Sequence, residues 1–268
     1  MKHELSIAKN AAVAAGEIIL KYYKSDYEVR DKGQTKFYTS HNPVTTADNA
    51  ANDYLKEIIN CEFPDDGWFS EETVDSPERL DKDRVWIVDP LDGTKEFIEG
   101  VPNFVVSIAM VIDQRPHIGI LYNPVTKELF SSIRRMGSWL NDEPIECTSL
   151  DGPKSMVILN SRSETKKGLW SPYSDKFKEL RAIGSVAYKL GLISAGKADI
   201  FVSLRPKNEW DICAGHCIIE GAGGVLLNIK GETIKYNKKD TLILPGIIAG
   251  HPDAVGKVLN IFSNHSLK

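Results

Sequence analysis

Two aspartates, Asp89 and Asp92, follow the apolar run Val85–Val88, and only a proline and a leucine separate them. Proline lacks the N–H that continues a strand ladder, and the glycine at position 93 permits a tight turn. Such a turn aims carboxylates and free N–H groups at one point. Carboxylates bind hard cations such as Mg²⁺, and helix-start N–H groups bind phosphate. The segment suits a metal-held phosphate, although a plain Asp-x-x-Asp-Gly turn is the simpler alternative.

Further acidic residues could complete such a site. Glu71 and Glu72 follow a strand-like stretch, Asp48 precedes a helical pattern, and Asp211 follows Trp210 at another expected helix start. Each has a structural alternative, since the glutamates would suit a solvated loop and the aspartates would suit helix N-caps. Asp211 is the least ordinary of them, because a charge between a tryptophan and an apolar helix needs a partner.

The spacing of apolar residues along the chain predicts the helices and strands that position these acids. A polar loop is expected over 25–43. Helical spacing predicts helices over 4–24, 48–60, 173–180, 185–196, 212–222 and 251–262. Short β-rich runs predict strands over 85–89, 104–113, 117–124, 128–135, 155–160, 198–204, 223–229 and 245–250. The first strands form an expected antiparallel meander. Strands mixed with helices indicate a layered α/β (α+β) fold in two halves, 1–150 and 151–268.

Composition excludes several classes of partner. The 268 residues are 42% hydrophobic and 26% charged, with a net charge of -4 and a pI of about 5.9. No basic stripe or membrane-length apolar run occurs, so neither a nucleic-acid polymer nor a membrane is an expected partner. The four cysteines show no disulfide spacing and no export signal precedes them, which predicts reduced thiols and a cytoplasmic location.

The acidic motifs, taken together, resemble a known family. SEET, WIVDPLDGTKEF and EWDICAGH resemble, in order and spacing, the signatures of the inositol monophosphatase superfamily of Mg²⁺-dependent, lithium-sensitive phosphatases. NPVTTAD and LPGIIAG extend the resemblance over nearly the whole chain. It implies an α/β/α/β/α sugar-phosphatase sandwich, two or three Mg²⁺ ions, and an active site between the halves.

The resemblance also implies roles for individual residues. Gly93 and Thr94 would hold phosphate by backbone N–H groups, and Thr94 and Asp48 would orient or deprotonate the attacking water. Clustered carboxylates repel one another unless cations are bound, and two metals can serve both ends of an in-line displacement. The implied metal ligands are Glu71, Asp89, Asp92, Asp211 and the Leu91 carbonyl.

Residues outside these motifs favour the 3′(2′),5′-bisphosphate nucleotidase branch of the superfamily. Lys95 and Lys189 match that branch, and Leu204 stands where inositol monophosphatases carry a glutamate that holds inositol hydroxyls. Glu164 replaces the histidine expected in the nucleotidases. The predicted substrate-binding residues are Ser161, Gly184, Ser185, Lys189 and Arg205, with added positive charge from Lys207.

The expected reaction is hydrolysis of 3′-phosphoadenosine 5′-phosphate to AMP and phosphate, in a monomer or homodimer. One alternative is an inositol-1-phosphate or histidinol-phosphate monophosphatase. A second alternative, from another class, is a non-catalytic protein that binds nucleotide or metal on the same fold. Substrate profiling would distinguish the bisphosphate nucleotidase from the first alternative, and binding without turnover would indicate the second alternative.

Overall fold

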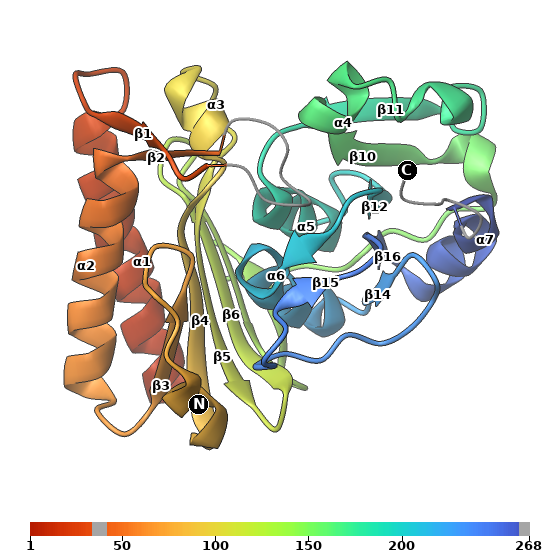
Figure 1. Cartoon of the computed structure of the whole chain (residues 1–268). Helices are drawn as coiled ribbons and strands as arrows, with labels where there is room; N and C mark the ends of the chain where they lie inside the picture. Colours follow the sequence, from red (N-terminus) through yellow and green to blue (C-terminus); the bar gives the residue numbers. More distant parts are fainter. Residues whose placement is uncertain (34–41, 263–268) are drawn as a thin grey trace.

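A seven-stranded sheet is the centre of the N-terminal half of the computed structural model, which describes residues 1–33 and 42–262 (Figure 1). Its strand order follows the chain from β3 to β9, and only the β3–β4 pair is parallel. The predicted antiparallel meander is therefore confirmed. The bounds are β3 Gly67–Ser70, β4 Arg84–Asp92, β5 Val105–Ile112, β6 Arg115–Asn123, β7 Glu128–Ile133, β8 Gly137–Leu140 and β9 Glu143–Pro144.

Helices cover both faces of this sheet. One face packs against α1 and α2 through a core that includes Ala12, Leu55 and Trp86. The other face packs against α5 and α6. Double coverage explains why β4 is buried from Val85 to Asp92, and why its sequence is apolar without alternation. The helices are α1 Lys2–Tyr22, α2 Thr46–Glu62, α5 Val186–Ser194 and α6 Glu209–Gly221.

A second, five-stranded sheet lies on the far side of α5 and α6, in the order β11-β10-β12-β16-β14. Its outer face packs against α7, where Trp170 and Phe262 form part of a separate core. This stacking gives the α/β/α/β/α sandwich, so the predicted fold is confirmed. The bounds are β10 Val157–Ser161, β11 Glu179–Ile183, β12 Ile200–Ser203, β14 Val225–Asn228, β16 Ile247–Gly250 and α7 Pro252–Phe262.

Short elements complete the described chain. Two small antiparallel pairs, β1 with β2 and β13 with β15, lie outside the large sheets. None of the helices in residues 1–33 and 42–262 is long and apolar enough to cross a membrane. The division of the chain into two halves near residue 150 stays a prediction. The bounds are β1 Val29–Asp31, β2 Pro43–Thr45, α3 Thr94–Ile98, α4 Arg162–Lys166, β13 Lys207–Asn208 and β15 Leu242–Ile243.

The helix predicted over 173–180 is wrong. A short 3-10 turn, Ser171–Tyr173, is followed by the edge strand β11, which pairs in parallel with β10. The backbone hydrogen bonds offered by β10 therefore outweigh the local helical spacing. The loop predicted over 25–43 contains β1, and the rest of that prediction over residues 34–41 lies outside the described part of the chain.

Candidate active site

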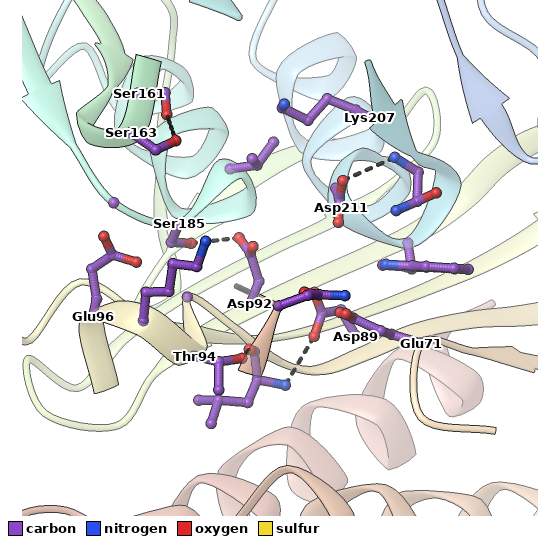
Figure 2. A pocket seen from close by; sticks show the side chains of 18 of the residues that line it. Glu71, Asp89, Asp92, Thr94, Glu96, Ser161, Ser163, Ser185, Lys207 and Asp211 are labelled. Atoms are coloured by element: carbon purple, nitrogen blue, oxygen red, sulfur yellow. Dashed lines mark hydrogen bonds between the residues drawn. The ribbon is translucent and has the colours of Figure 1, made fainter. Parts of the chain in front are cut away.

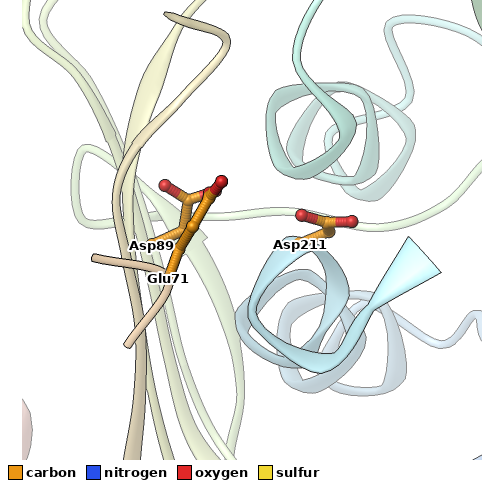
Figure 3. A group of neighbouring side chains, drawn as sticks. All are labelled: Glu71, Asp89 and Asp211. Atoms are coloured by element: carbon orange, nitrogen blue, oxygen red, sulfur yellow. The ribbon is translucent and has the colours of Figure 1, made fainter. Parts of the chain in front are cut away.

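Three carboxylates from separate elements converge between the seven-stranded sheet and α6. Glu71 follows β3, Asp89 lies on β4 and Asp211 lies in the first turn of α6. One oxygen of each lies within 4.8 Å of the others. Figure 3 shows Glu71 and Asp89 together at the sheet, facing Asp211 on the helix. The structure thus brings together three of the predicted metal ligands.

Local backbone structure explains where these side chains point. The Glu71 N–H donates to the Val88 carbonyl at 3.1 Å, which extends the β3–β4 register by one residue beside Asp89. The register of β4 against β5 then shifts between Asp89 and Asp92, so the strand bends where its carboxylates begin. The Leu91 N–H donates to Asp89 at 3.0 Å and orients that carboxylate.

Asp211 is held by a capping box at the start of α6. The Asn208 N–H donates to Asp211 Oδ2 at 2.9 Å. The N-cap is therefore Asn208 and Asp211 lies at N3, so Asp211 is not the N-cap that the sequence left open as an alternative; the capping box coexists with the carboxylate cluster. One oxygen caps the helix, and the side chain still faces Glu71 and Asp89 (Figure 3).

Burial and mutual repulsion disfavour the ionised form of these acids. Burial, with the charges of Asp92 and Glu71, raises the pKa of Asp211 to about 8, and Lys207 opposes the rise. Burial also raises the pKa of Asp89 well above its ordinary value, and the charges of Glu71, Asp92 and Asp211 add to this effect. A bound cation would remove both penalties.

Lys32 supplies positive charge to this cluster and was not anticipated from the sequence. Its ammonium donates to Glu71 Oε1 at 2.8 Å and also contacts Glu72. Burial lowers the pKa of Lys32, but the two glutamates outweigh burial and raise the pKa above its ordinary value. A lysine in a polar loop gives no sequence signal of this kind, because such residues normally face water.

The donor set fits Mg²⁺. Every side-chain ligand in the group Glu71, Asp89 and Asp211 is a carboxylate oxygen, which hard divalent cations prefer. Asp89 and Asp211 are buried, and a buried anionic cluster of this kind is stable only when a cation or protons compensate it. The residues present therefore suit the cation that the resemblance implies.

A hydrogen-bonded pair of side chains, Thr94 and Asp48, lies beside the cluster. The Thr94 hydroxyl donates to Asp48 Oδ1 at 3.0 Å and lies 3.2 Å from the Leu91 carbonyl. The other Asp48 oxygen accepts hydrogen bonds from the N–H and hydroxyl of Thr45, which cap α2. Burial raises the pKa of Asp48 to about 6. Asp48 is therefore placed to accept a proton near neutral pH through the Thr94 hydroxyl.

Gly93 makes the turn from β4 into α3 possible. Its φ of +108° lies in the region that favours glycine, and an added Cβ would lie 2.8 Å from the Asn103 carbonyl oxygen. The turn places Gly93 and Thr94 in the wall of a cavity of about 590 Å³ beside the carboxylates. That volume is typical of a small-molecule site.

Asp92 links the end of β4 to the start of α5. Its Oδ2 accepts a hydrogen bond from the Ser185 hydroxyl at 2.5 Å and another from the Ala187 N–H at 2.6 Å. Burial raises the pKa of Asp92 to about 6, while these bonds oppose the rise. Within the described chain Asp92 lies outside the 4.8 Å group, although it lines the same cavity (Figure 2).

The predicted substrate-binding residues divide into two groups. Ser161, Gly184, Ser185 and Lys189 line the cavity together with the metal-ligand candidates. Arg205 is not among the residues that line the cavity, and its part in substrate binding stays a prediction. Figure 2 shows residues from Glu71 to Asp211 around one space, and an active site between two halves of the chain stays a prediction.

Lys189 lines the cavity but already has hydrogen-bond partners. The residue is only 2% exposed, and its ammonium donates to the carbonyls of Ile183, Gly184 and Ser185 at 2.9, 3.2 and 2.5 Å. An ammonium has three N–H groups, so all are used. Burial lowers its pKa to about 8. Its role in substrate binding stays a prediction, and its ammonium also holds the turn formed by Ile183, Gly184 and Ser185.

Glu164, which stands in place of an expected histidine, faces the protein core. It is 1% exposed and accepts hydrogen bonds from Trp170 Nε1, the Ser203 hydroxyl and the Leu204 N–H at 3.0, 2.7 and 3.3 Å. It does not line the cavity. The substitution at this position therefore serves packing within the C-terminal half.

The carboxylate cluster, the Thr94–Asp48 hydrogen bond and the layered fold agree with the result of a comparison with protein families. Residues 1–266 match the family described as the inositol monophosphatase family. The chain belongs to the inositol monophosphatase family. With its buried carboxylate cluster, it is a metal-dependent phosphomonoesterase of that family.

Individual relatives cover most of the chain. An inositol monophosphatase of Mesembryanthemum crystallinum is 32% identical over 238 residues, which are 85% of this chain and 86% of that protein. The Nus factor SuhB of Escherichia coli K12 is 30% identical over 266 residues, 95% of this chain and 94% of that protein. The predicted superfamily is confirmed, whereas these relatives are not named as bisphosphate nucleotidases.

Solved structures support the fold. The extragenic suppressor protein suhB of Bartonella henselae has a TM-score of 0.85 at 25% identity, covering 98% of this chain and 100% of that chain. An IMPase of Thermotoga maritima has a TM-score of 0.84 at 25% identity, covering 97% and 96%. The mixed α/β architecture is thus shared along the whole length.

Proposed function

We propose that the protein hydrolyses small phosphate monoesters with Mg²⁺ held by Glu71, Asp89 and Asp211. The convergence of these carboxylates within 4.8 Å at the wall of a cavity carries the proposal. Asp92 and the Leu91 carbonyl are proposed as further ligands, for a total of two or three ions. When bound, Mg²⁺ supplies Lewis-acid stabilisation of the negative charge that develops during phosphoryl transfer.

The residues of the chain perform the remaining tasks. Thr94 donates its hydroxyl hydrogen to Asp48, so its oxygen is free to accept a hydrogen bond from water. Asp48 takes the proton that the water loses as it attacks the phosphorus. The backbone N–H groups of Gly93 and Thr94 orient the phosphate oxygens. No covalent enzyme intermediate is required.

Inositol monophosphate is the first substrate candidate, because the curated relatives include enzymes named inositol monophosphatase. A bisphosphate nucleotide, such as 3′-phosphoadenosine 5′-phosphate, is the second. Leu204 favours the bisphosphate nucleotide over inositol monophosphate, since the Leu204 side chain is buried and offers no carboxylate for inositol hydroxyls. The ring of Trp210 lines the cavity and offers an apolar surface for a base.

The test is phosphate release with Mg²⁺ from inositol 1-phosphate and 3′-phosphoadenosine 5′-phosphate at equal concentrations. We expect Mg²⁺-dependent turnover of at least one ester, and we expect Asp89→Asn to lower it by about a thousandfold or more. Circular dichroism of the variant checks that the fold is kept. An active Asp89→Asn enzyme would contradict the proposed metal site.

Tight nucleotide binding without turnover would instead indicate a non-catalytic binding protein. That alternative is ranked lower because the carboxylate cluster and the Thr94–Asp48 hydrogen bond are both present. The monomeric or dimeric state, a cytoplasmic location and lithium sensitivity stay predictions.

A further inference from the structure

Arg79 is a buried cation to which the proposed reaction gives no task. It lies in the short 3-10 turn Pro77–Asp81, which follows the segment that carries Glu71, and it is only 2% exposed. Its guanidinium donates to both carboxylate oxygens of Asp75, at 2.6 and 2.9 Å. A bidentate ion pair of this kind fixes the plane of the guanidinium. Because burial of a charged group costs free energy, a buried arginine indicates a demand at this position.

The same guanidinium also contacts the loop that precedes β15. Its Nη1 donates to Asn237 Oδ1 at 2.6 Å, and its Nη2 donates to the Lys238 carbonyl at 3.0 Å. In return, the side-chain amide of Asn237 donates to the Arg79 carbonyl at 3.2 Å. Asn237 has a φ of +54°, which asparagine adopts more readily than most residues. Arg79 and Asn237 are therefore joined in both directions, although 158 positions separate them in sequence.

Glu209 connects this loop to the helix that carries Asp211. The Glu209 carboxylate is fully buried and accepts hydrogen bonds from the backbone N–H groups of Asn237 and Lys238, at 2.7 and 3.1 Å. Glu209 is the first residue of α6, and Asp211 lies in the same turn. The loop thus holds the start of α6, and Arg79 holds the loop.

Arg79 also packs against the strand that leads to Glu71. Its guanidinium lies 4.2 Å from the centroid of the Phe69 ring on β3, which is a cation–π contact. The Phe69 and Trp210 rings then meet edge to face, with their centroids 5.1 Å apart. Phe69 stands two residues before Glu71, and Trp210 directly precedes Asp211. This second set of contacts therefore also connects Arg79 to both sides of the carboxylate cluster.

We propose that Arg79 is a positioning residue that sets the separation of Glu71 from Asp211. It acts through Asn237 on the side of α6 and through Phe69 on the side of β3. This inference rests on the proposed function and deepens it. The two carboxylates repel each other before Mg²⁺ binds, so contacts outside the cluster must hold their elements together. Ligands already held at the right separation bind an ion more tightly, because less free energy is spent on ordering them.

The test measures Mg²⁺ affinity by calorimetry in the wild type, Arg79→Met and Asn237→Gly. Arg79→Met removes the guanidinium and keeps an apolar chain beside Phe69. Asn237→Gly removes only the side-chain bridge, because glycine adopts a φ of +54° without strain and the backbone N–H to Glu209 remains. We expect Mg²⁺ to bind about tenfold more weakly to both variants, as is usual when the support of metal ligands is removed.

Each variant has a matched control elsewhere in the chain. Arg84, the first residue of β4, makes the same kinds of contact with Asp66 and with the Phe63 ring. Arg84→Met should therefore also lower the stability to urea, but it should leave the Mg²⁺ affinity unchanged. Asn141, between β8 and β9, has a φ of +49°, so Asn141→Gly makes the second substitution at a similar backbone conformation. It too should keep the Mg²⁺ affinity of the wild type.

Unchanged Mg²⁺ affinity in Arg79→Met or in Asn237→Gly would overturn the inference. An equal loss of affinity in Arg84→Met would overturn it as well, because general destabilisation would then be the cause. If Arg79→Met does not fold, Asn237→Gly decides: weaker Mg²⁺ binding than in Asn141→Gly supports the inference, and equal binding refutes it.

Failure of the proposed function gives a different result. If the wild type binds Mg²⁺ but hydrolyses neither inositol 1-phosphate nor 3′-phosphoadenosine 5′-phosphate, the proposed hydrolysis fails, and calorimetry of the variants still decides the inference. A wild type that binds no Mg²⁺ contradicts the proposed metal site and the inference together.

Discussion

Replacement of Asp211 by asparagine should stabilise the metal-free protein, although it removes a proposed metal ligand. Burial and the neighbouring acids raise the pKa of Asp211 to about 8 from an ordinary value of 3.8. The unfolded chain therefore releases this proton at low pH while the native state keeps it. Folding takes up a proton between these two pKa values, so stability falls as pH rises across that window.

The magnitude follows from the width of the window. Each pH unit between the two pKa values costs about 1.4 kcal/mol, so the loss at pH 7 is about 4 kcal/mol and the loss at pH 4 is under about 1 kcal/mol. Asparagine has no proton to exchange, and its amide oxygen can still accept the capping bond from the Asn208 N–H. Asp211→Asn should therefore gain up to about 4 kcal/mol at pH 7 and little at pH 4.

The assay is urea unfolding of both proteins in EDTA at pH 4, 5, 6, 7 and 8. Asp65→Asn, at an exposed aspartate, is the matched control and should follow the wild type. Excess Mg²⁺ should stabilise the wild type and reduce the advantage of Asp211→Asn, because only the wild type keeps the full ligand set. An Asp211→Asn curve that runs parallel to the wild type from pH 4 to pH 8 would refute the reasoning.

Two lysines allow further tests. Lys189→Met leaves the buried carbonyls of Ile183, Gly184 and Ser185 without their donor, so urea unfolding should show a loss of about 2–4 kcal/mol. Unchanged stability would mean that other groups satisfy these carbonyls. Lys32→Met removes the ammonium that competes for Glu71, so calorimetry should show Mg²⁺ binding about three- to tenfold tighter. Weaker binding would show that Lys32 assists the metal.

Local sequence patterns were enough to predict the candidate ligands and much of the layering. The motif from Asp89 to Thr94 is local, since a proline, a glycine and a helix start within six residues define the turn wherever the strand is placed. Asp48 and Asp211 also follow local rules, because each completes a capping box at a helix start. The continuous apolar run of β4 and the helical periodicity of the long helices then predicted the buried sheet.

Which carboxylates lie together, and which cations they contact, depends on the packing of elements that are distant in sequence. Lys189, Arg205 and Lys207 are all basic residues near one another in sequence, yet one holds a turn, one lies outside the cavity and one points into it. The edge strand β11 replaced an expected helix for a related reason, since β10 supplied its hydrogen bonds. Hydrogen-bond partners and burial are set by residues distant in sequence, so local patterns do not specify them.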